Sequence, residues 1–295
     1  MGYDISVRRS AATKRDKTGR LCRHLNGTVN LEMPHELMRK KLLEYGAMTI
    51  ETTAYGKDNW KAKARYFPEQ AEMTKEDIMI ICGDFGGVWF GDSRDDDDLD
   101  WLERLPFTLV FVDGNHENFD AIATYPVEEW HGGKIHRIRP HVLHLMRGQI
   151  FKLEGYRFFT MGGAKSHDIE DGILEPDAPD FERKYLMLRR NPRARFRINH
   201  ISWWEQELPS DEEYTEAKRN LDRCGWQADY IITHCAPSST AIMESCHNKA
   251  DRLTEFLQEV KEKAEYSYWL FGHYHDNRAI DSKHILLWEQ IVQII

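Results

Sequence analysis

Four short polar segments of this sequence contain side chains that can bind a metal ion, and each follows an apolar run. They are Gly83-Asp84, Gly114-Asn115-His116-Glu117, Thr233-His234 and Gly272-His273-Tyr274-His275. Glycines in these segments allow the backbone to turn sharply and to approach a ligand closely. Ligands of open α/β sheets bind outside the carboxyl ends of the strands. If each apolar run is a strand, the four segments therefore converge on one crevice.

The expected donors are one carboxylate, one amide oxygen and three imidazoles, from Asp84, Asn115, His234, His273 and His275. This mixture of hard and borderline donors suits Mn²⁺, Fe, Zn²⁺ or Mg²⁺ better than a metal selected by thiolates. Taken singly, each histidine is better explained as a core or surface residue. Together, four glycine-containing segments at strand ends favour a centre of divalent metal ions, with one or two ions per chain.

The elements that must position these residues alternate between strand and helix from residue 77 onward. Continuous apolar runs are typical of strands covered on both faces, and they predict strands over Ile78–Cys82, Phe107–Val112, Tyr156–Met161, Tyr230–Thr233, Tyr268–Phe271 and His284–Trp288. Helical patterns cover Asp98–Leu105, Glu212–Cys224 and Asp251–Tyr266. The pattern indicates an α/β fold.

The N-terminal part of the sequence lacks this alternation of strands and helices. Residues 1–46 are expected to form a basic, partly disordered extension with one helix over Pro34–Gly46, and residues 47–295 to form the main domain. Met48–Tyr55 is β-branched and is expected to be a strand and turn before Gly56. Up to Lys75 the chain has 15 Lys and Arg against 9 Asp and Glu, a net charge of +6. Because the whole chain has a net charge of −9, the residues after Lys75 have a net charge of −15.

Composition narrows the classes of function. The 295 residues are 41% hydrophobic and 30% charged, which is typical of a soluble globular protein. No run approaches the ~20 apolar residues that span a bilayer, so no membrane partner is expected. Five cysteines without a C-x-x-C pair indicate reduced thiols and a cytoplasmic location. An acidic main body argues against a nucleic-acid partner unless a local basic surface or a metal compensates.

The order of the motifs resembles that of the calcineurin-like metallophosphoesterase superfamily, and in particular its small bacterial and phage branch. The family pattern is D-x-H, G-D, G-N-H-[ED], a lone H and G-H-x-H, and the last four blocks are present within residues 77–295. The resemblance implies a four-layer α/β sandwich of two mixed β-sheets flanked by helices. It also implies hydrolysis of a phosphate mono- or diester by a metal-activated water.

The resemblance also implies roles for single residues. Asp84 would bridge two metal ions, Asn115, His234 and His273 would complete the second metal site, and His275 would belong to the first. His116 would protonate the leaving oxygen or stabilise charge on the phosphate. In the family the two ions lie roughly 3.5–4 Å apart and convert a bridging water into hydroxide for in-line attack.

The D-x-H block is missing. Thr53-Ala54-Tyr55-Gly56 stands in its place, and a hydroxyl and a phenol replace the carboxylate and the imidazole. The first metal site then keeps only Asp84 and His275. Two interpretations follow: a phosphoesterase with an impaired first metal site, or a catalytically inactive relative that binds metal or a phosphorylated ligand. Because Asp84 is followed by Phe85-Gly86-Gly87-Val88, the x-x-D-R continuation of Ser/Thr protein phosphatases is absent.

The sequence does not select the substrate. A phosphorylated small molecule, a nucleotide or a protein would all suit the same metal core, and the substrate-binding residues and oligomeric state are open.

Three weaker signals have alternative explanations. The glycine-rich Met161–Asp168 segment either borders the site or is a plain structural turn. Five arginines between Arg189 and Arg197 either clamp a phosphorylated substrate or form a solvated helix end that balances acidic neighbours. His131, His136, His141 and His144 have no compact ligand spacing and are interpreted as strand and loop histidines.

Overall fold

The computed structural model describes residues 48–50, 67–244, 250–288 and 291–295. The expected disordered extension and the helix over Pro34–Gly46 lie outside the described residues, so the domain boundary at residue 46 stays a prediction. No helix among the described residues is both long and apolar enough to cross a bilayer.

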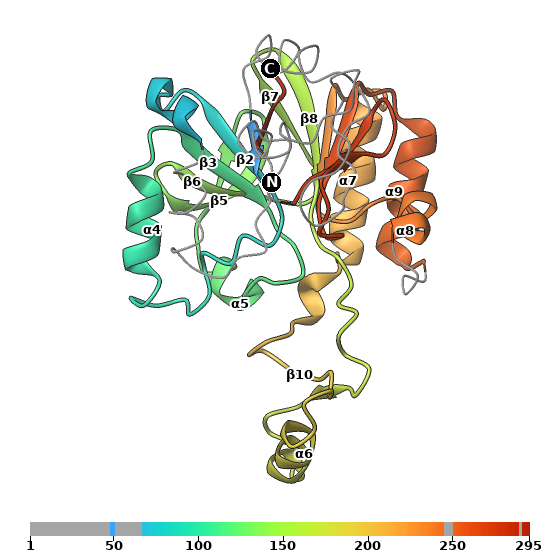
Figure 1. The fold of residues 1–295 in the computed structure, drawn as a ribbon. Helices are drawn as coiled ribbons and strands as arrows, with labels where there is room; N and C mark the ends of the chain where they lie inside the picture. The colour runs from blue at the N-terminus through green and yellow to red at the C-terminus, as the bar shows by residue number, and fades with distance from the viewer. Residues whose placement is uncertain (1–47, 51–66, 245–249, 289–290) are drawn as a thin grey trace, which may run out of the picture.

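Two mixed sheets form the centre of the molecule (Figure 1). The first contains, in spatial order, β15 (Ile291–Gln293), β1 (Met48–Ile50), β2 (Ile78–Cys82), β3 (Thr108–Val112), β6 (Val142–Leu145), β5 (Gly133–Arg139) and β4 (Val127–Trp130). Its four central strands, β1, β2, β3 and β6, are parallel, and its outer strands are antiparallel. The parallel strands therefore end at one common edge.

The second sheet has the same plan. It contains β13 (Arg278–Ala279), β14 (His284–Leu286), β12 (Tyr268–Phe271), β11 (Tyr230–Thr233), β8 (Tyr156–Met161) and β7 (Gln149–Leu153). The strands β14, β12, β11 and β8 are parallel, whereas β13 and β7 run antiparallel to their neighbours. Parallel order again brings the ends of β11 and β12 to one edge.

Alternate side chains of the strands enter different layers of the core. In β2, Ile80 packs between the two sheets, whereas Met79 packs with Leu99 of α4 (Asp96–Glu103). On the other sheet, Ile231 of β11 packs against α7 (Asp211–Arg223) and α9 (Arg252–Lys263). Both sheets are thus covered on both faces, which makes the four layers that the resemblance implies and confirms the expected fold class.

The predicted elements agree closely with the structure where apolar runs are continuous. The strands β2, β8, β11 and β12 have the expected bounds, and α7 and α9 begin at capping boxes, Ser210 with Glu213 and Asp251 with Thr254. The sequence does not predict the strands β4, β5, β6, β7, β9, β10, β13 and β15, which are short or contain polar residues that interrupt the apolar pattern. Unexpected helical segments are η1 (Pro68–Glu72), α5 (Phe119–Ile122), α6 (Phe181–Arg189), η2 (Glu205–Glu207) and α8 (Ser238–Glu244).

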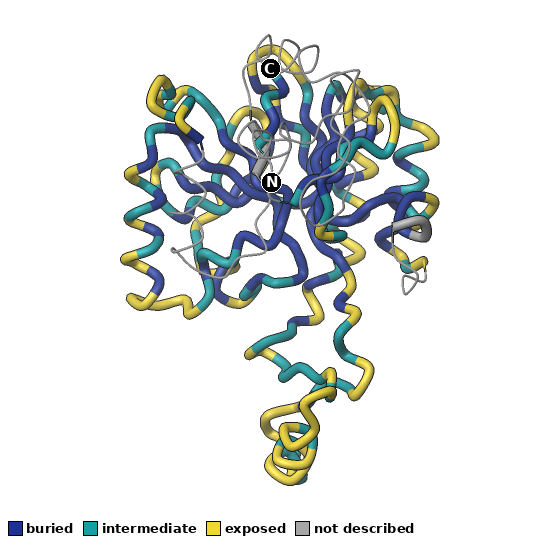
Figure 2. Tube along the Cα trace, in the orientation of Figure 1, coloured by how far each residue is buried: buried dark blue, intermediate teal, exposed yellow. Residues whose placement is uncertain are grey.

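One segment projects from the body of the molecule. Residues 169–203, here called the arm, contain β9 (Ile173–Leu174), α6 and β10 (Arg197–Ile198), and Figure 1 shows them below the two sheets. Most of the arm is exposed, in contrast to the buried strands of the body (Figure 2). At its base, the His200 ring and the Trp204 indole both contact the Asp120 carboxylate, at 2.6 and 2.7 Å.

Candidate functional site

Asp84 and His234 meet where the carboxyl ends of the two sheets face each other. Asp84 follows β2 and His234 follows β11, and His234 Nε2 lies 3.3 Å from Asp84 Oδ1. His234 Nδ1 donates a hydrogen bond of 2.8 Å to the carbonyl of Cys82, the last residue of β2. This hydrogen bond fixes the ring orientation and leaves Nε2 to face the carboxylate.

The loop that contains Asp84 is held by Glu117. The carboxylate of Glu117, which is fully buried, accepts hydrogen bonds from the backbone amides of Phe85 (2.6 Å) and Gly86 (3.1 Å). Burial, reinforced by the charge of Asp84, raises the pKa of Glu117 well above its usual value. The backbone amide of His116 donates to Asp84 Oδ1 at 3.1 Å. The Asp84 loop and the 114–117 segment therefore support each other.

Two glycines permit this close packing. A Cβ at Gly83 would lie 2.1 Å from His234 Nδ1, and a Cβ at Gly114 would lie 2.1 Å from Asp84 Oδ1. Gly83 also has a positive φ of 100°, which side chains disfavour. Asp84, His273 and His275 adopt positive φ as well, at 51°, 72° and 52°. Such strained positions in non-glycine residues concentrate at functional sites.

The Asn115 side chain is oriented by the glycine-rich segment after β8. Asn115 Nδ2 donates to Ser166 Oγ at 3.3 Å, and Ser166 Oγ in turn donates to Glu207 Oε2 at 2.6 Å. Asn115 Oδ1 is buried and accepts no hydrogen bond from any described residue. The Met161–Asp168 segment therefore borders the site, which favours the first of its two interpretations.

The structure brings His273 to the same place, and His275 lies near Asp84 and His234 but is more exposed than His273. The ring of His273 lies 5.1 Å from that of His234 and 6.2 Å from that of His167. Burial lowers the pKa of His273 well below its usual value, and the neighbouring imidazoles lower it further. His275 is exposed, and its ring stacks on Trp288 at 5.7 Å. A neutral His273 is in the protonation state that a metal ligand requires.

The donor chemistry of the site fits a divalent cation. Asn115 Oδ1 is buried and no described residue donates a hydrogen bond to it. His234 Nε2 faces the Asp84 carboxylate, and its Nδ1 is already hydrogen-bonded. Across the described ranges, no three His, Cys, Asp or Glu side chains lie together closely enough to hold an ion by themselves. The fit therefore rests on the oxygens of Asp84 and Asn115 together with the nitrogen of His234.

His116 lies beside these donors. Burial lowers the pKa of the His116 imidazole, while the charge of Asp84 opposes this effect and that of Arg197 adds to it. The role of His116, like the ligand roles of the other five residues, stays a prediction. Thr53 and Tyr55, which stand in place of the D-x-H block, lie outside the described residues. β1, which precedes them in the chain, pairs parallel to β2, with Ile50 opposite Ile81.

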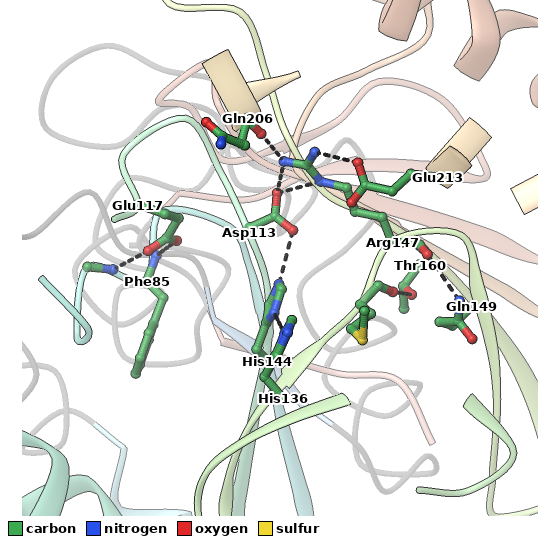
Figure 3. A network of polar contacts seen from close by, with 12 residues as sticks. Phe85, Asp113, Glu117, His136, His144, Arg147, Gln149, Thr160, Gln206 and Glu213 are labelled. Carbon is green, nitrogen blue, oxygen red and sulfur yellow. Dashed lines mark hydrogen bonds and ion pairs between the residues drawn. The ribbon is translucent and has the colours of Figure 1, made fainter. Parts of the chain in front are cut away.

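A buried polar network behind the site was missed by sequence reasoning (Figure 3). Asp113 is 1% exposed, and its carboxylate accepts hydrogen bonds from Arg147 Nε at 2.9 Å and from His144 Nε2 at 3.0 Å. Arg147 also donates to Glu213 Oε2 at 3.2 Å and to the Gln206 carbonyl at 2.7 Å. The signal in the sequence was a carboxylate directly after the largely apolar strand β3.

His136 extends this network. Burial lowers its pKa to about 4, so the ring is neutral near pH 7. His136 Nδ1 lies 2.9 Å from His144 Nδ1, and His144 Nε2 is the donor to Asp113. The network is therefore satisfied when His136 donates to His144. His141 instead pairs with Glu103, and His131 contacts the Lys152 carbonyl. The four histidines form no common cluster, in agreement with their interpretation as strand and loop residues.

Two of the five clustered arginines balance acidic neighbours. Arg195 pairs with Glu170 at 3.3 Å, and Arg197 pairs with Asp168. Within the described part of the chain, Arg189, Arg190 and Arg193 are exposed and pair with no carboxylate. The expectation of a balanced helix end thus holds for only part of the cluster.

Comparisons with known proteins agree with the fold and the motifs. A family model for calcineurin-like phosphoesterases matches residues 34–277. Lariat debranching enzyme A of Xenopus laevis is 23% identical over 148 residues, which cover 43% of this chain and 26% of that protein. The lariat debranching enzyme of Danio rerio is 21% identical over 164 residues, covering 48% and 27%. The matched segments span about a quarter of the length of these curated relatives.

Gly83→Ala is expected to weaken metal binding, because its Cβ would displace His234. We expect the affinity for Mn²⁺, measured by isothermal titration calorimetry, to fall about 10–100-fold, the usual effect of moving a ligand's support. Gly86→Ala is the matched control: Gly86 also has a positive φ, of 61°, but a Cβ there meets nothing within 4 Å. The control should keep its Mn²⁺ affinity and lose only about 1 kcal/mol of stability. Equal affinities in both variants would contradict the placement of His234.

Asp113→Asn is expected to destabilise the fold by about 3 kcal/mol at pH 7, because it leaves the buried Arg147 guanidinium without its main partner. Burial alone would raise the pKa of Asp113, but Arg147 and His144 hold it well below its usual value. The ion pair therefore stabilises the fold fully above the unfolded-state pKa of Asp113, about 3.9. This stabilisation is lost as the pH falls through the lower folded-state pKa.

Urea unfolding between neutral and acidic pH checks this prediction. The difference in unfolding free energy between the unmodified chain and Asp113→Asn should shrink as pH falls below about 4. Asp92→Asn, which removes an exposed partner of Arg94, should change stability little at any pH. A pH-independent effect of Asp113→Asn would show that the ion pair does not carry the stabilisation.

Proposed function

The chain belongs to the calcineurin-like phosphoesterase family, and on this premise we propose that it hydrolyses a phosphate ester with the help of one or two divalent metal ions. The observation that carries the proposal is the meeting of Asp84 and His234 across the two sheets, together with the buried Oδ1 of Asn115, which accepts no hydrogen bond from a described residue. Mn²⁺, Fe, Zn²⁺ and Mg²⁺ all suit this donor set.

The metal would be held by Asp84, Asn115, His234 and His273, with His275 as the protein ligand specific to the first site. When bound, it would supply Lewis-acid stabilisation of the phosphate and activation of the attacking water. The protein's own part is to keep these donors in place. Cys82 orients His234, Ser166 orients Asn115, and Glu117 holds the Asp84 loop through two backbone amides.

His116 is proposed to act on the leaving group. Its backbone is fixed by Asp84 Oδ1, so its ring has a defined position next to the donor atoms. From that position it would protonate the leaving oxygen or stabilise negative charge on the phosphate. Arg197 is among the charged groups that act on His116, and it would add positive charge on the same side of the phosphate.

A second candidate is a relative that binds metal or a phosphorylated ligand without turnover. The residues at the position of the D-x-H block favour it, because Thr53 and Tyr55 replace a carboxylate and an imidazole. The proposed substrate is a phosphorylated small molecule, a nucleotide or a phosphorylated protein. The proposed location is the cytoplasm. The curated relatives are named for the debranching of lariats, and a phosphodiester is the ester class that we propose for this chain on that ground.

The proposal is tested by hydrolysis of bis-p-nitrophenyl phosphate with Mn²⁺ and by its loss in His116→Ala. We expect turnover to fall about 10²–10⁴-fold, the usual contribution of a positioned proton donor. Mn²⁺ affinity should stay the same, since His116 is not proposed as a ligand. His141→Ala, which removes a histidine that pairs with Glu103, is the control and should keep full turnover. Loss of bound Mn²⁺ in His116→Ala would reassign this residue as a ligand.

The impaired first metal site is tested by restoring the missing block. The double substitution Thr53→Asp with Tyr55→His is expected to raise bound Mn²⁺ toward two ions per chain and to increase turnover of the same ester, because it supplies a carboxylate and an imidazole. Thr53→Ala with Tyr55→Phe is the matched control and should give no gain. Strong two-metal activity in the unmodified chain, with no gain from the restoring pair, would contradict an impaired site.

A further inference from the structure

The two halves of the arm differ in charge: residues 169–182, its acidic half, contain six acidic residues and no Lys or Arg. Between residues 183 and 197 the arm contains seven basic residues and no acidic one: Arg183, Lys184, Arg189, Arg190, Arg193, Arg195 and Arg197. The whole chain has a net charge of −9. The net charge of the chain therefore repels a polyanion, whereas this part of the arm attracts one.

Ion pairs neutralise the basic residues next to the acidic half of the arm. Asp180 contacts Arg183 at 3.4 Å and Lys184 at 3.1 Å, and Arg195 pairs with Glu170. Arg189, at the end of α6, and Arg190 and Arg193, in the turn after it, have no carboxylate partner among the described residues. These three guanidinium groups are available to bind an anion, which Arg can do through two parallel hydrogen bonds.

The arm has a defined shape and an exposed apolar surface. The Tyr185 ring stacks on Phe181 at 5.8 Å and packs edge-on against Phe196 at 6.0 Å. This small aromatic cluster connects α6 to the segment that precedes β10. On the same helix Leu186 is 46% exposed and Met187 is 62% exposed. The Arg189 guanidinium lies over the Tyr185 ring at 5.9 Å. Exposed apolar side chains on the same segment as guanidinium groups that have no carboxylate partner among the described residues are typical of a binding surface.

The base of the arm is connected to the candidate site. The Met161–Asp168 segment contacts Asn115 through Ser166, and its last residue, Asp168, pairs with Arg197 of β10. Arg197 and Asp168 are both among the charged groups that act on His116. A long ligand that lies along the arm would therefore reach the site.

We propose that the arm binds a nucleic-acid strand and directs one of its phosphodiesters to the site. The choice of a phosphate polymer rests on the proposed phosphoesterase function. Charge complementarity supports it, since three exposed arginines that pair with no carboxylate among the described residues lie on a chain with a net charge of −9. A strand with a phosphate at every nucleotide can contact the arm and the site at the same time. The arm is the local basic surface that net charge alone does not reveal.

The test compares two triple variants that remove the same charge. Arg189→Ala, Arg190→Ala and Arg193→Ala are combined in the arm variant. Arg94→Ala, Arg219→Ala and Arg252→Ala form the control, since these arginines are 62%, 53% and 63% exposed but each pairs with a carboxylate on the body. Binding of a fluorescein-labelled single-stranded RNA is measured by anisotropy, without added divalent metal, over a series of salt concentrations.

We expect the arm variant to bind the RNA about tenfold or more weakly than the unmodified chain. The slope of log affinity against log salt should become shallower by about 2, because each phosphate contact to a single strand contributes roughly 0.7. The control should keep affinity and slope. No RNA binding by the unmodified chain, or equal losses in both variants, would overturn the proposal. Competition by polyglutamate as strong as that by unlabelled RNA would also overturn it, in favour of an acidic protein partner.

Hydrolysis of bis-p-nitrophenyl phosphate separates this proposal from the proposed function. The small ester does not extend to α6, so the arm variant should hydrolyse it with unchanged kcat and KM. A loss of this activity would make the three arginines part of the catalytic site or of its folding, and would overturn a role in strand binding. If the unmodified chain binds RNA through the arm but does not hydrolyse the small ester, the proposed function fails and the binding surface stands.

Discussion

The buried ion pair between Asp113 and Arg147 is the interaction on which the arrangement of the site depends. Asp113 directly follows β3 of the first sheet, two residues before Asn115, and Arg147 lies in the turn that leads from the first sheet into β7 of the second. Arg147 also contacts the carbonyl of Gln206 and the carboxylate of Glu213 in α7. One guanidinium group thus links both sheets and an outer helix at the edge where the candidate ligands lie.

Burying two charges is favourable only when their remaining hydrogen-bonding capacity is used. Here the Asp113 carboxylate also accepts from His144, and the neutral His136 ring completes the chain of hydrogen bonds. Gly162 and Gly163 allow this packing: a Cβ at Gly162 would lie 2.4 Å from Asp113 Oδ1, and one at Gly163 would lie 2.6 Å from the Glu207 carbonyl. The same segment then supplies Ser166 to Asn115, so the ion pair and the orientation of a candidate ligand share one support.

The site and the arm use charge in opposite ways. At the site, carboxylates and neutral imidazoles are gathered in a buried environment, which favours a cation. In the arm, exposed guanidinium groups project into solvent, where their attraction for an anion is screened within about 8 Å at physiological salt. A chain that is acidic overall but gathers seven basic residues between positions 183 and 197 therefore directs a polyanion to one side of the molecule rather than to its whole surface.

The sequence by itself determined the α/β class, the strands with continuous apolar runs and the residues expected at their ends, because these depend on local periodicity and on the common edge of parallel strands. It could not place Glu117 or Asp113 as supports, since their partners are 31 to 34 residues away in the chain. Nor could it predict β4 and β5, in which polar residues interrupt the apolar pattern.

Tertiary structure also decided which alternatives hold. The glycine-rich segment borders the site because Gly163 binds the Asp113 carbonyl and Ser166 reaches Asn115. The arginine run divides because only Arg195 and Arg197 lie next to a carboxylate of the described residues, Glu170 and Asp168 respectively. The sequence states which side chains are present. Whether two charges pair depends on distances of a few ångströms between segments that are far apart in the chain. Only the packing of the tertiary structure sets those distances.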